Sequence, residues 1–150
     1  MIPVVIVHEN YQEFLKSNVE ITGKNNSIFL IGNESVKILE DHPSVTYINI
    51  KKYLNMEKLK TFEKEFVHYG DKDRRTYMFW FIRMLIMSEF AKEYELESFF
   101  SCDSDNTILV NVNDFNFKRE NAITIPDEWE PFYYGASVHS GLITSNFCNV

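Results

Sequence analysis

The stretch Ser98-Phe99-Phe100-Ser101-Cys102-Asp103-Ser104-Asp105-Asn106-Thr107-Ile108-Leu109-Val110 decides how we interpret the fold and the function. Its apolar first part, residues 98–102, predicts a buried strand, and the apolar run from Ile108 predicts a second one. Asp103 and Asp105 lie in the turn between them. Residues two apart in an extended chain point to the same side, so both carboxylates can face one ion. Their oxygens suit Mg²⁺ or Mn²⁺, which in turn hold phosphates; the alternative is a solvated turn whose aspartates only hydrogen-bond locally.

Composition and charge indicate a globular protein and exclude some partners. The 150 residues, 45% hydrophobic and 25% charged, are enough for one domain with a substantial core. The net charge of −7 argues against general nucleic-acid binding, which needs a basic surface. The most apolar segment, 77–91, is shorter than the roughly 20 residues of a transmembrane helix. Two cysteines, Cys102 and Cys148, suit a reduced protein better than a disulfide scaffold, so we expect a cytoplasmic protein.

Predicted strands and helices alternate along most of the chain, which indicates an α/β fold with a Rossmann-like sheet and flanking helices. β-Branched and aromatic runs predict the strands, and helical spacing of apolar side chains predicts the helices. The predicted strands are residues 2–7, 27–31, 45–50 and 98–102, with further ones from Ile108 and over 132–135. The predicted helices are residues 11–21, 54–66 and 77–94, with a short helical turn at 36–39.

Polar residues follow the first predicted strand directly, as His8-Glu9-Asn10. Because ligands of open α/β sheets bind beyond the carboxyl ends of strands, this segment is a candidate contact for a base or a ribose. Capping of the next helix by Glu9 and Asn10 explains the same residues, and both interpretations stay open. After the second strand, Gly32 is either a turn glycine or a position where backbone closely approaches a ligand.

Arg83 lies inside the long apolar helix predicted over residues 77–94. A buried guanidinium without a partner is costly, so Arg83 requires a carboxylate or a phosphate. Asp103, Asp105 or a bound diphosphate would each serve. A structural ion pair and direct contact with a ligand both place Arg83 near the turn. The Arg74-Arg75 pair, by contrast, is interpreted as a surface feature.

Three features taken together resemble nucleotide-sugar-dependent glycosyltransferases with the GT-A fold. The first is the opening strand and helix, residues 2–21, which lead into Ser-Ile-Phe-Leu-Ile-Gly-Asn-Glu-Ser at 27–35. The second is the helix segment Phe79-Trp80-Phe81-Ile82-Arg83, which leads into Phe90. The third is Phe99-Phe100-Ser101-Cys102-Asp103-Ser104-Asp105 at the end of the next strand. The resemblance covers most of residues 2–112.

The resemblance implies where a UDP- or GDP-linked sugar and its metal would bind. Asp103 and Asp105 would be the Asp-x-Asp signature that holds Mn²⁺ or Mg²⁺ on the donor diphosphate, and Ser104 would lie at the donor between them. Arg83 matches an arginine that in this family supports the phosphates or the aspartates. The metal would stabilise the departing diphosphate while an acceptor hydroxyl attacks the anomeric carbon.

The resemblance also implies the nucleotide and acceptor sides of the site. The end of the first strand would meet the nucleotide, through Val7, His8, Glu9 and Asn10. On the acceptor side the candidate is His139. GT-A domains are usually longer, and only 45 residues follow Asp105. We therefore expect residues 1–150 to be one nucleotide-sugar-binding domain whose acceptor half is short or missing, and a non-catalytic remnant stays an alternative.

Two other classes share parts of the pattern. Asp103-Ser104-Asp105-Asn106-Thr107 resembles the Asp-x-Asp-x-Thr motif of haloacid-dehalogenase-type phosphatases, with Asp103 as nucleophile and Asp105 as acid and base beside Mg²⁺. That motif normally opens its domain, whereas most of this chain precedes it. A calcium loop would use Asp103, Asp105 and Asp114 at its first, third and twelfth positions, but its required glycine is replaced by Ile108.

Overall fold

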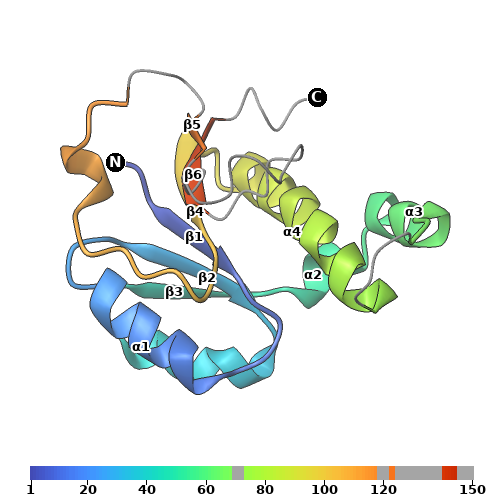
Figure 1. Cartoon of the computed structure of the whole chain (residues 1–150), viewed down its shortest axis with the longest axis horizontal. Coiled ribbons are helices and arrows are strands. Elements are labelled where there is room, and N and C mark those ends of the chain that lie inside the picture. The colour runs from blue at the N-terminus through green and yellow to red at the C-terminus, as the bar shows by residue number, and fades with distance from the viewer. Residues whose placement is uncertain (69–72, 118–121, 124–139, 145–150) are drawn as a thin grey trace, which may run out of the picture.

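The centre of the computed structural model, which describes residues 1–68, 73–117, 122–123 and 140–144, is a six-stranded sheet. Its order is β3-β2-β1-β4-β6-β5; β1 to β4 run parallel, and β6 is antiparallel to β4 and β5 (Figure 1). The strands are β1 Val4–Val7, β2 Ile28–Gly32, β3 Val45–Asn49, β4 Ser98–Cys102, β5 Ala122–Ile123 and β6 Ser140–Thr144. The α-helices are α1 Glu13–Thr22, α2 Lys51–Leu54, α3 Glu57–Glu65 and α4 Arg74–Glu93, and the 3-10 helices are η1 Glu34–Asp41 and η2 Val112–Asp114.

Strand β1 is buried on both faces, because helices cover both sides of the sheet (Figure 1). Val4 and Ile6 pack in the apolar cluster that contains the buried side of α1, whereas Val5 and Val7 pack in the cluster of α4. A strand whose two faces are both covered has a continuous β-branched sequence rather than an alternation of apolar and polar residues. The predicted α/β class is thereby confirmed, and the sheet is consistent with a Rossmann-like fold.

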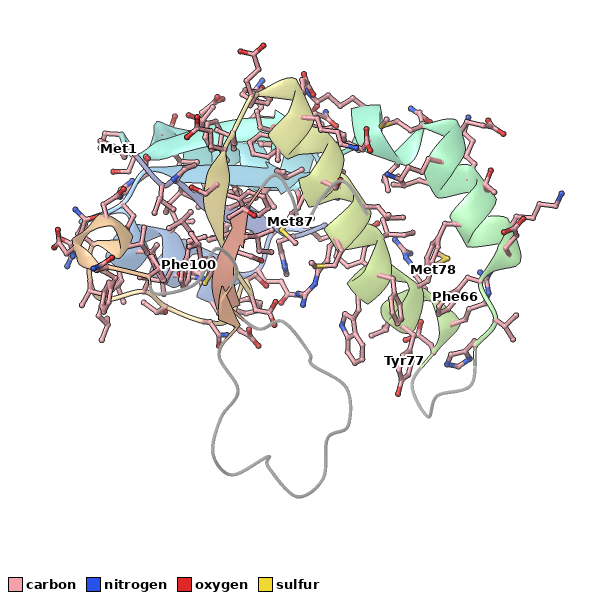
Figure 2. All side chains as sticks on the ribbon, turned by 90° about the horizontal axis from the view of Figure 1, so that it is seen from above. Met1, Phe66, Tyr77, Met78, Met87 and Phe100 are labelled. Carbon is pink, nitrogen blue, oxygen red and sulfur yellow. The ribbon has the colours of Figure 1, made fainter. Side chains whose placement is uncertain are left out.

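Helix α4 begins three residues before the predicted start, at Arg74, because Asp73 caps it. The Thr76 amide donates to Asp73 Oδ1 over 3.0 Å, which satisfies one of the exposed N–H groups of the first turn. In the view from above, Met87 lies against the sheet, while Tyr77 and Met78 lie at the other end of the helix, away from it (Figure 2). The first turns of α4 therefore project past the edge of the sheet.

The strand predicted from Ile108 is wrong. No helix or strand lies between β4 and η2, because side chains of α1 and of the loop after it bind the backbone of this segment. The Ile108 amide donates to Thr22 Oγ1 over 3.0 Å, and the Val110 carbonyl accepts from Asn26 Nδ2 over 2.9 Å. Backbone groups held in this way are unavailable for strand pairing.

The strand that pairs with β4 on the side away from β1 is instead β6, which was not predicted as a strand. It pairs over its full length, from Ser98 opposite Thr144 to Cys102 opposite Ser140. The signal was the short apolar pair Leu142 and Ile143, both buried. The strand predicted over 132–135 and His139 lie outside the described residues. Among the helices that the structure describes, none is long and apolar enough to cross a bilayer.

Candidate functional site

The strand order reverses between β1 and β4, and both predicted site segments lie at this point. After β1 the chain crosses through α1 to β2, whereas it reaches β4 through α4 on the other face (Figure 1). Open α/β sheets bind ligands in the crevice beyond the carboxyl ends of the strands at such a switch point. Residues 8–10 and 103–105 directly follow these two parallel strands, so they lie at the same edge of the sheet.

The Asp-x-Asp segment is a closed turn at the end of β4, not the extended segment from which the common direction of the two carboxylates was predicted. The Asn106 amide donates to the Asp103 carbonyl over 3.0 Å. The Cys102 thiol donates to the Asn106 carbonyl over 2.9 Å. Burial, together with the charges of Asp103 and Asp105, raises the pKa of Cys102 to about 12. The thiol therefore stays protonated at neutral pH and remains a hydrogen-bond donor within the turn.

Arg83 of α4 forms an ion pair with Asp103, through Nη1 and Oδ1. Both side chains are largely buried, at 17% and 14% exposure. From the place of Arg83 in an apolar helix, we predicted that its guanidinium requires a nearby anion. The ion pair shows that Asp103 is such an anion and places Arg83 beside the turn. Asp105, in contrast, is exposed. The site thus contains one carboxylate whose charge is balanced by the Arg83 guanidinium and one carboxylate that faces solvent.

The end of β1 is fixed by backbone contacts with β2 and the loop after it. The His8 amide donates to the Ile31 carbonyl over 2.9 Å, and the Asn33 amide donates to the Glu9 carbonyl over 3.0 Å. Gly32 lies so close that an added Cβ would overlap the His8 carbonyl oxygen. Gly32 therefore allows a close approach between the end of β2 and the backbone that follows β1.

Glu9 and Asn10 do not cap the following helix, so that interpretation of the two residues is wrong. The N-cap of α1 is Gln12, which makes no side-chain cap hydrogen bond. Asn10 Oδ1 instead accepts from Asn33 Nδ2 over 2.5 Å, and Glu9 pairs with Arg75. Both side chains thereby stay at the carboxyl edge of the sheet.

The imidazole of His8, which directly follows β1, is partly buried. Burial lowers its pKa below the ordinary value of 6.5, against opposing effects from the Asn10 backbone and from the charges of Asp105 and Glu9. Its ring packs edge-on against Phe14 with centroids 5.6 Å apart. Nε2 of His8 is buried and has no hydrogen-bond partner among the described residues. A neutral imidazole therefore lies within electrostatic range of Asp105.

Arg75 lies beside the candidate site, a position that was not predicted from the sequence. It is exposed, as predicted, but its guanidinium lies 2.5 Å from Glu9 at the end of β1. The pair borders a cavity of about 380 Å³ with an apolar wall from α3 and α4. A usable signal existed: since α4 runs back antiparallel to β4, its first turn must begin at the carboxyl edge. The cavity is lined by Glu9, Leu54, Leu59, Glu63, Arg74, Arg75, Met78, Phe79 and Ile82.

A row of buried polar side chains on α1 and the loop after it was not predicted either. Asn18, Thr22 and Asn26 are spaced four apart, are at most 6% exposed, and all bond to the segment after β4. Asn18 Nδ2 donates to the Ser104 carbonyl over 2.8 Å, inside the turn itself. The sequence signal was a polar residue every fourth position where a helix should present its apolar face.

The described residues around the turn provide too few ligands for a cation held by protein alone. No group of three or more His, Cys, Asp or Glu side chains with metal-binding geometry occurs in the described parts of the chain. The turn offers two carboxylates, of which Asp103 is partly compensated by Arg83. Mg²⁺ is commonly bound through one or two carboxylates together with substrate phosphates and water. The donor set is compatible with that arrangement.

The calcium-loop alternative is contradicted by the positions of its ligands. Asn113, beside Asp114, bonds to both backbone groups of Ile2, at the amino end of β1. Asp103 follows the carboxyl end of the parallel strand β4. Asp114 and Asp103 therefore lie toward opposite edges of the sheet and do not form one calcium loop.

Comparison with known proteins gives a structural likeness and no sequence match. No protein-family model matches the chain, and no curated protein matches it. Among solved structures, the apo form of mouse xyloside xylosyltransferase 1 matches with a TM-score of 0.60. The fold is similar to that of a glycosyltransferase. The match covers 99% of this chain and 68% of that chain at 8% identity, so the likeness concerns the fold alone.

Proposed function

We propose that this chain binds a nucleotide-diphosphate sugar and transfers the sugar to an acceptor hydroxyl, with Mn²⁺ or Mg²⁺ held by Asp103 and Asp105. The observation that supports this most is the position of the turn. It follows a central strand at the switch point of the sheet, beside the end of β1. The fold-level likeness to a xylosyltransferase supports the same class of reaction.

In this proposal the residues of the turn and of α4 receive the donor diphosphate. Asp103 and Asp105 would supply hard oxygen ligands, and a bound cation would stabilise the negative charge that develops on the leaving diphosphate. Arg83 holds Asp103 in place within the largely buried part of the site. Because Asp103 balances the charge of Arg83, phosphate binding in a chain whose net charge is −7 would depend on the bound divalent cation.

The nucleoside would lie against the end of β1. Val7, His8, Glu9 and Asn10 form this end, and Glu9 borders the 380 Å³ cavity between α3 and α4. The cavity has apolar walls for a flat ring and a charged rim formed by Glu9 and Arg75. Its position beyond the carboxyl end of a parallel strand is typical of nucleotide sites in this class of sheet.

The test is thermal protection by UDP or GDP, measured with and without Mn²⁺. We expect one of the two nucleotides to raise the melting temperature of the wild-type protein only when Mn²⁺ is present. A ligand at 100 times its Kd stabilises a protein by about 2.7 kcal/mol. Asp103→Ala and Asp105→Ala should each lose this protection. Asp105 is exposed, so Asp105→Ala should melt like the wild type, whereas Asp103→Ala leaves the largely buried Arg83 without its anion and should melt at a lower temperature.

Asp114→Ala is the matched control, since Asp114 is exposed and lies toward the other edge of the sheet. It should keep full protection. Retained Mn²⁺-dependent protection in both Asp103→Ala and Asp105→Ala would refute the metal site. Hydrolysis of a generic phosphomonoester that is lost in Asp103→Asn would instead support the phosphatase alternative. Intact folding with neither activity would leave a non-catalytic domain.

A further inference from the structure

We infer that Asn18 is a positioning residue for the Asp-x-Asp turn, acting through the Ser104 carbonyl on the two aspartates beside it. The inference rests on the proposed metal site. Asn18 is 2% exposed and lies on α1, far from the turn in sequence. Its Nδ2 donates to the Ser104 carbonyl over 2.8 Å. Ser104 is the residue between Asp103 and Asp105, so this bond holds the centre of the pair.

The orientation of the Asn18 amide is itself fixed. Thr22 Oγ1, one helical turn further along α1, donates to Asn18 Oδ1 over 2.7 Å. The same hydroxyl accepts from the Ile108 amide over 3.0 Å. Because Oδ1 accepts from Thr22, Nδ2 of Asn18 must point to Ser104. The side chains of Asn18 and Thr22 thus form a hydrogen-bonded relay that joins α1 to Ser104 within the turn and to Ile108 after it.

A purely structural role does not require this arrangement, since the segment after the turn is held elsewhere. Asn26 donates to the Val110 carbonyl over 2.9 Å and accepts from the Val112 amide over 2.9 Å. Asn25 donates to the Leu109 carbonyl over 3.2 Å. Among these side chains, Asn18 is the one whose hydrogen bond reaches Ser104 itself. Removing a group that does not bind the metal but orients its ligands typically lowers metal affinity by about 10- to 100-fold.

The experiment compares Mn²⁺ affinity in Asn18→Leu and Asn26→Leu by isothermal titration, with UDP or GDP present, whichever protects the wild-type protein. Both substitutions remove a buried amide that bonds the same segment, so their effects on stability should be similar. We expect Asn18→Leu to weaken Mn²⁺ binding by about tenfold or more, and Asn26→Leu to bind Mn²⁺ like the wild type. Equal weakening in both variants, or none in Asn18→Leu, would overturn the inference.

Thr22→Val provides a second variant of unchanged shape, in case Asn18→Leu does not fold. It removes the hydroxyl that orients the Asn18 amide and should weaken Mn²⁺ binding in the same direction by a smaller factor. Unchanged affinity in Thr22→Val would then count against the relay. Absence of Mn²⁺ binding in the wild type would refute the proposed function, and this inference with it. Loss of binding in Asp103→Ala together with normal binding in Asn18→Leu would refute the inference alone.

Discussion

Replacing Gly32 by alanine should damage both the fold and the proposed nucleotide site. Gly32 ends β2, and a Cβ there would overlap the His8 carbonyl oxygen and would lie 2.5 Å from Val36 Cγ2. Val36 is fully buried and has little room to move. The oxygen belongs to backbone held on both sides, through the His8 amide and the Glu9 carbonyl. The strain can therefore be relieved only by moving the end of β1.

The magnitude follows from the kind of overlap. Overpacking that requires backbone shifts costs about 1–3 kcal/mol. For a domain of this size, a loss of about 2 kcal/mol lowers the melting temperature by roughly 4–8 °C. We expect Gly32→Ala to show such a fall, measured by circular dichroism. Protection by UDP or GDP with Mn²⁺ should be weakened as well, because the displaced atoms belong to His8 and Glu9.

Gly23→Ala is the matched control. Its Cβ would also be crowded, 2.7 Å from the Val19 carbonyl oxygen and 2.6 Å from His42 Cε1, but it lies between α1 and β2 at the amino edge. The helical φ of −69° suits alanine. Gly23→Ala should change the melting temperature of the free protein. The rise in melting temperature caused by UDP or GDP with Mn²⁺ should stay as large as in the wild type. Gly32→Ala with wild-type melting and wild-type protection would refute the reasoning.

Three further predictions concern packing, surface charge and pH. Phe90 is fully buried, so Phe90→Ala should lower the free energy of unfolding by about 3–5 kcal/mol, measured by urea denaturation. Arg75 is 73% exposed, so Arg75→Ala should change that free energy by less than about 1 kcal/mol, and a larger loss would show that its pair with Glu9 is more than a surface contact. The hydrogen bond from Lys58 lowers the pKa of Glu89 below its ordinary value of 4.5. The ionised, paired carboxylate thus contributes stability above that value, which is lost as the pH falls through the folded-state pKa; urea titrations between pH 7 and pH 3 should show a shallower decline in Glu89→Gln.

The parts of the fold that could be predicted are those in which a local pattern decides the structure. The β-branched run of residues 2–7 predicted a strand, and β1 forms there with both faces buried. The long apolar helix before β4 was predicted with a buried arginine in need of an anion, and Arg83 meets Asp103. These predictions held because burial and charge compensation constrain a residue wherever its partner lies in the chain.

The parts that could not be predicted depend on contacts between distant segments. The apolar run from Ile108 has the pattern of a strand, yet Thr22 and Asn26 bind its backbone groups. The sequence predicted Arg75 as an ordinary surface residue, but the fold places the first turn of α4, and Arg75 with it, beside Glu9. Spacing along the chain carries no information on such neighbours.

The amino-acid sequence by itself determined that a pair of acids follows a buried strand in an α/β protein, because strand burial and turn chemistry are local properties. Only the tertiary structure decided that this turn lies beside the end of β1, with Arg83, Arg75 and Asn18 reaching the same edge from two different helices. The physical reason is the crossing of the chain to opposite faces of the sheet, which brings residues far apart in sequence to the same edge of the sheet, beyond the ends of β1 and β4.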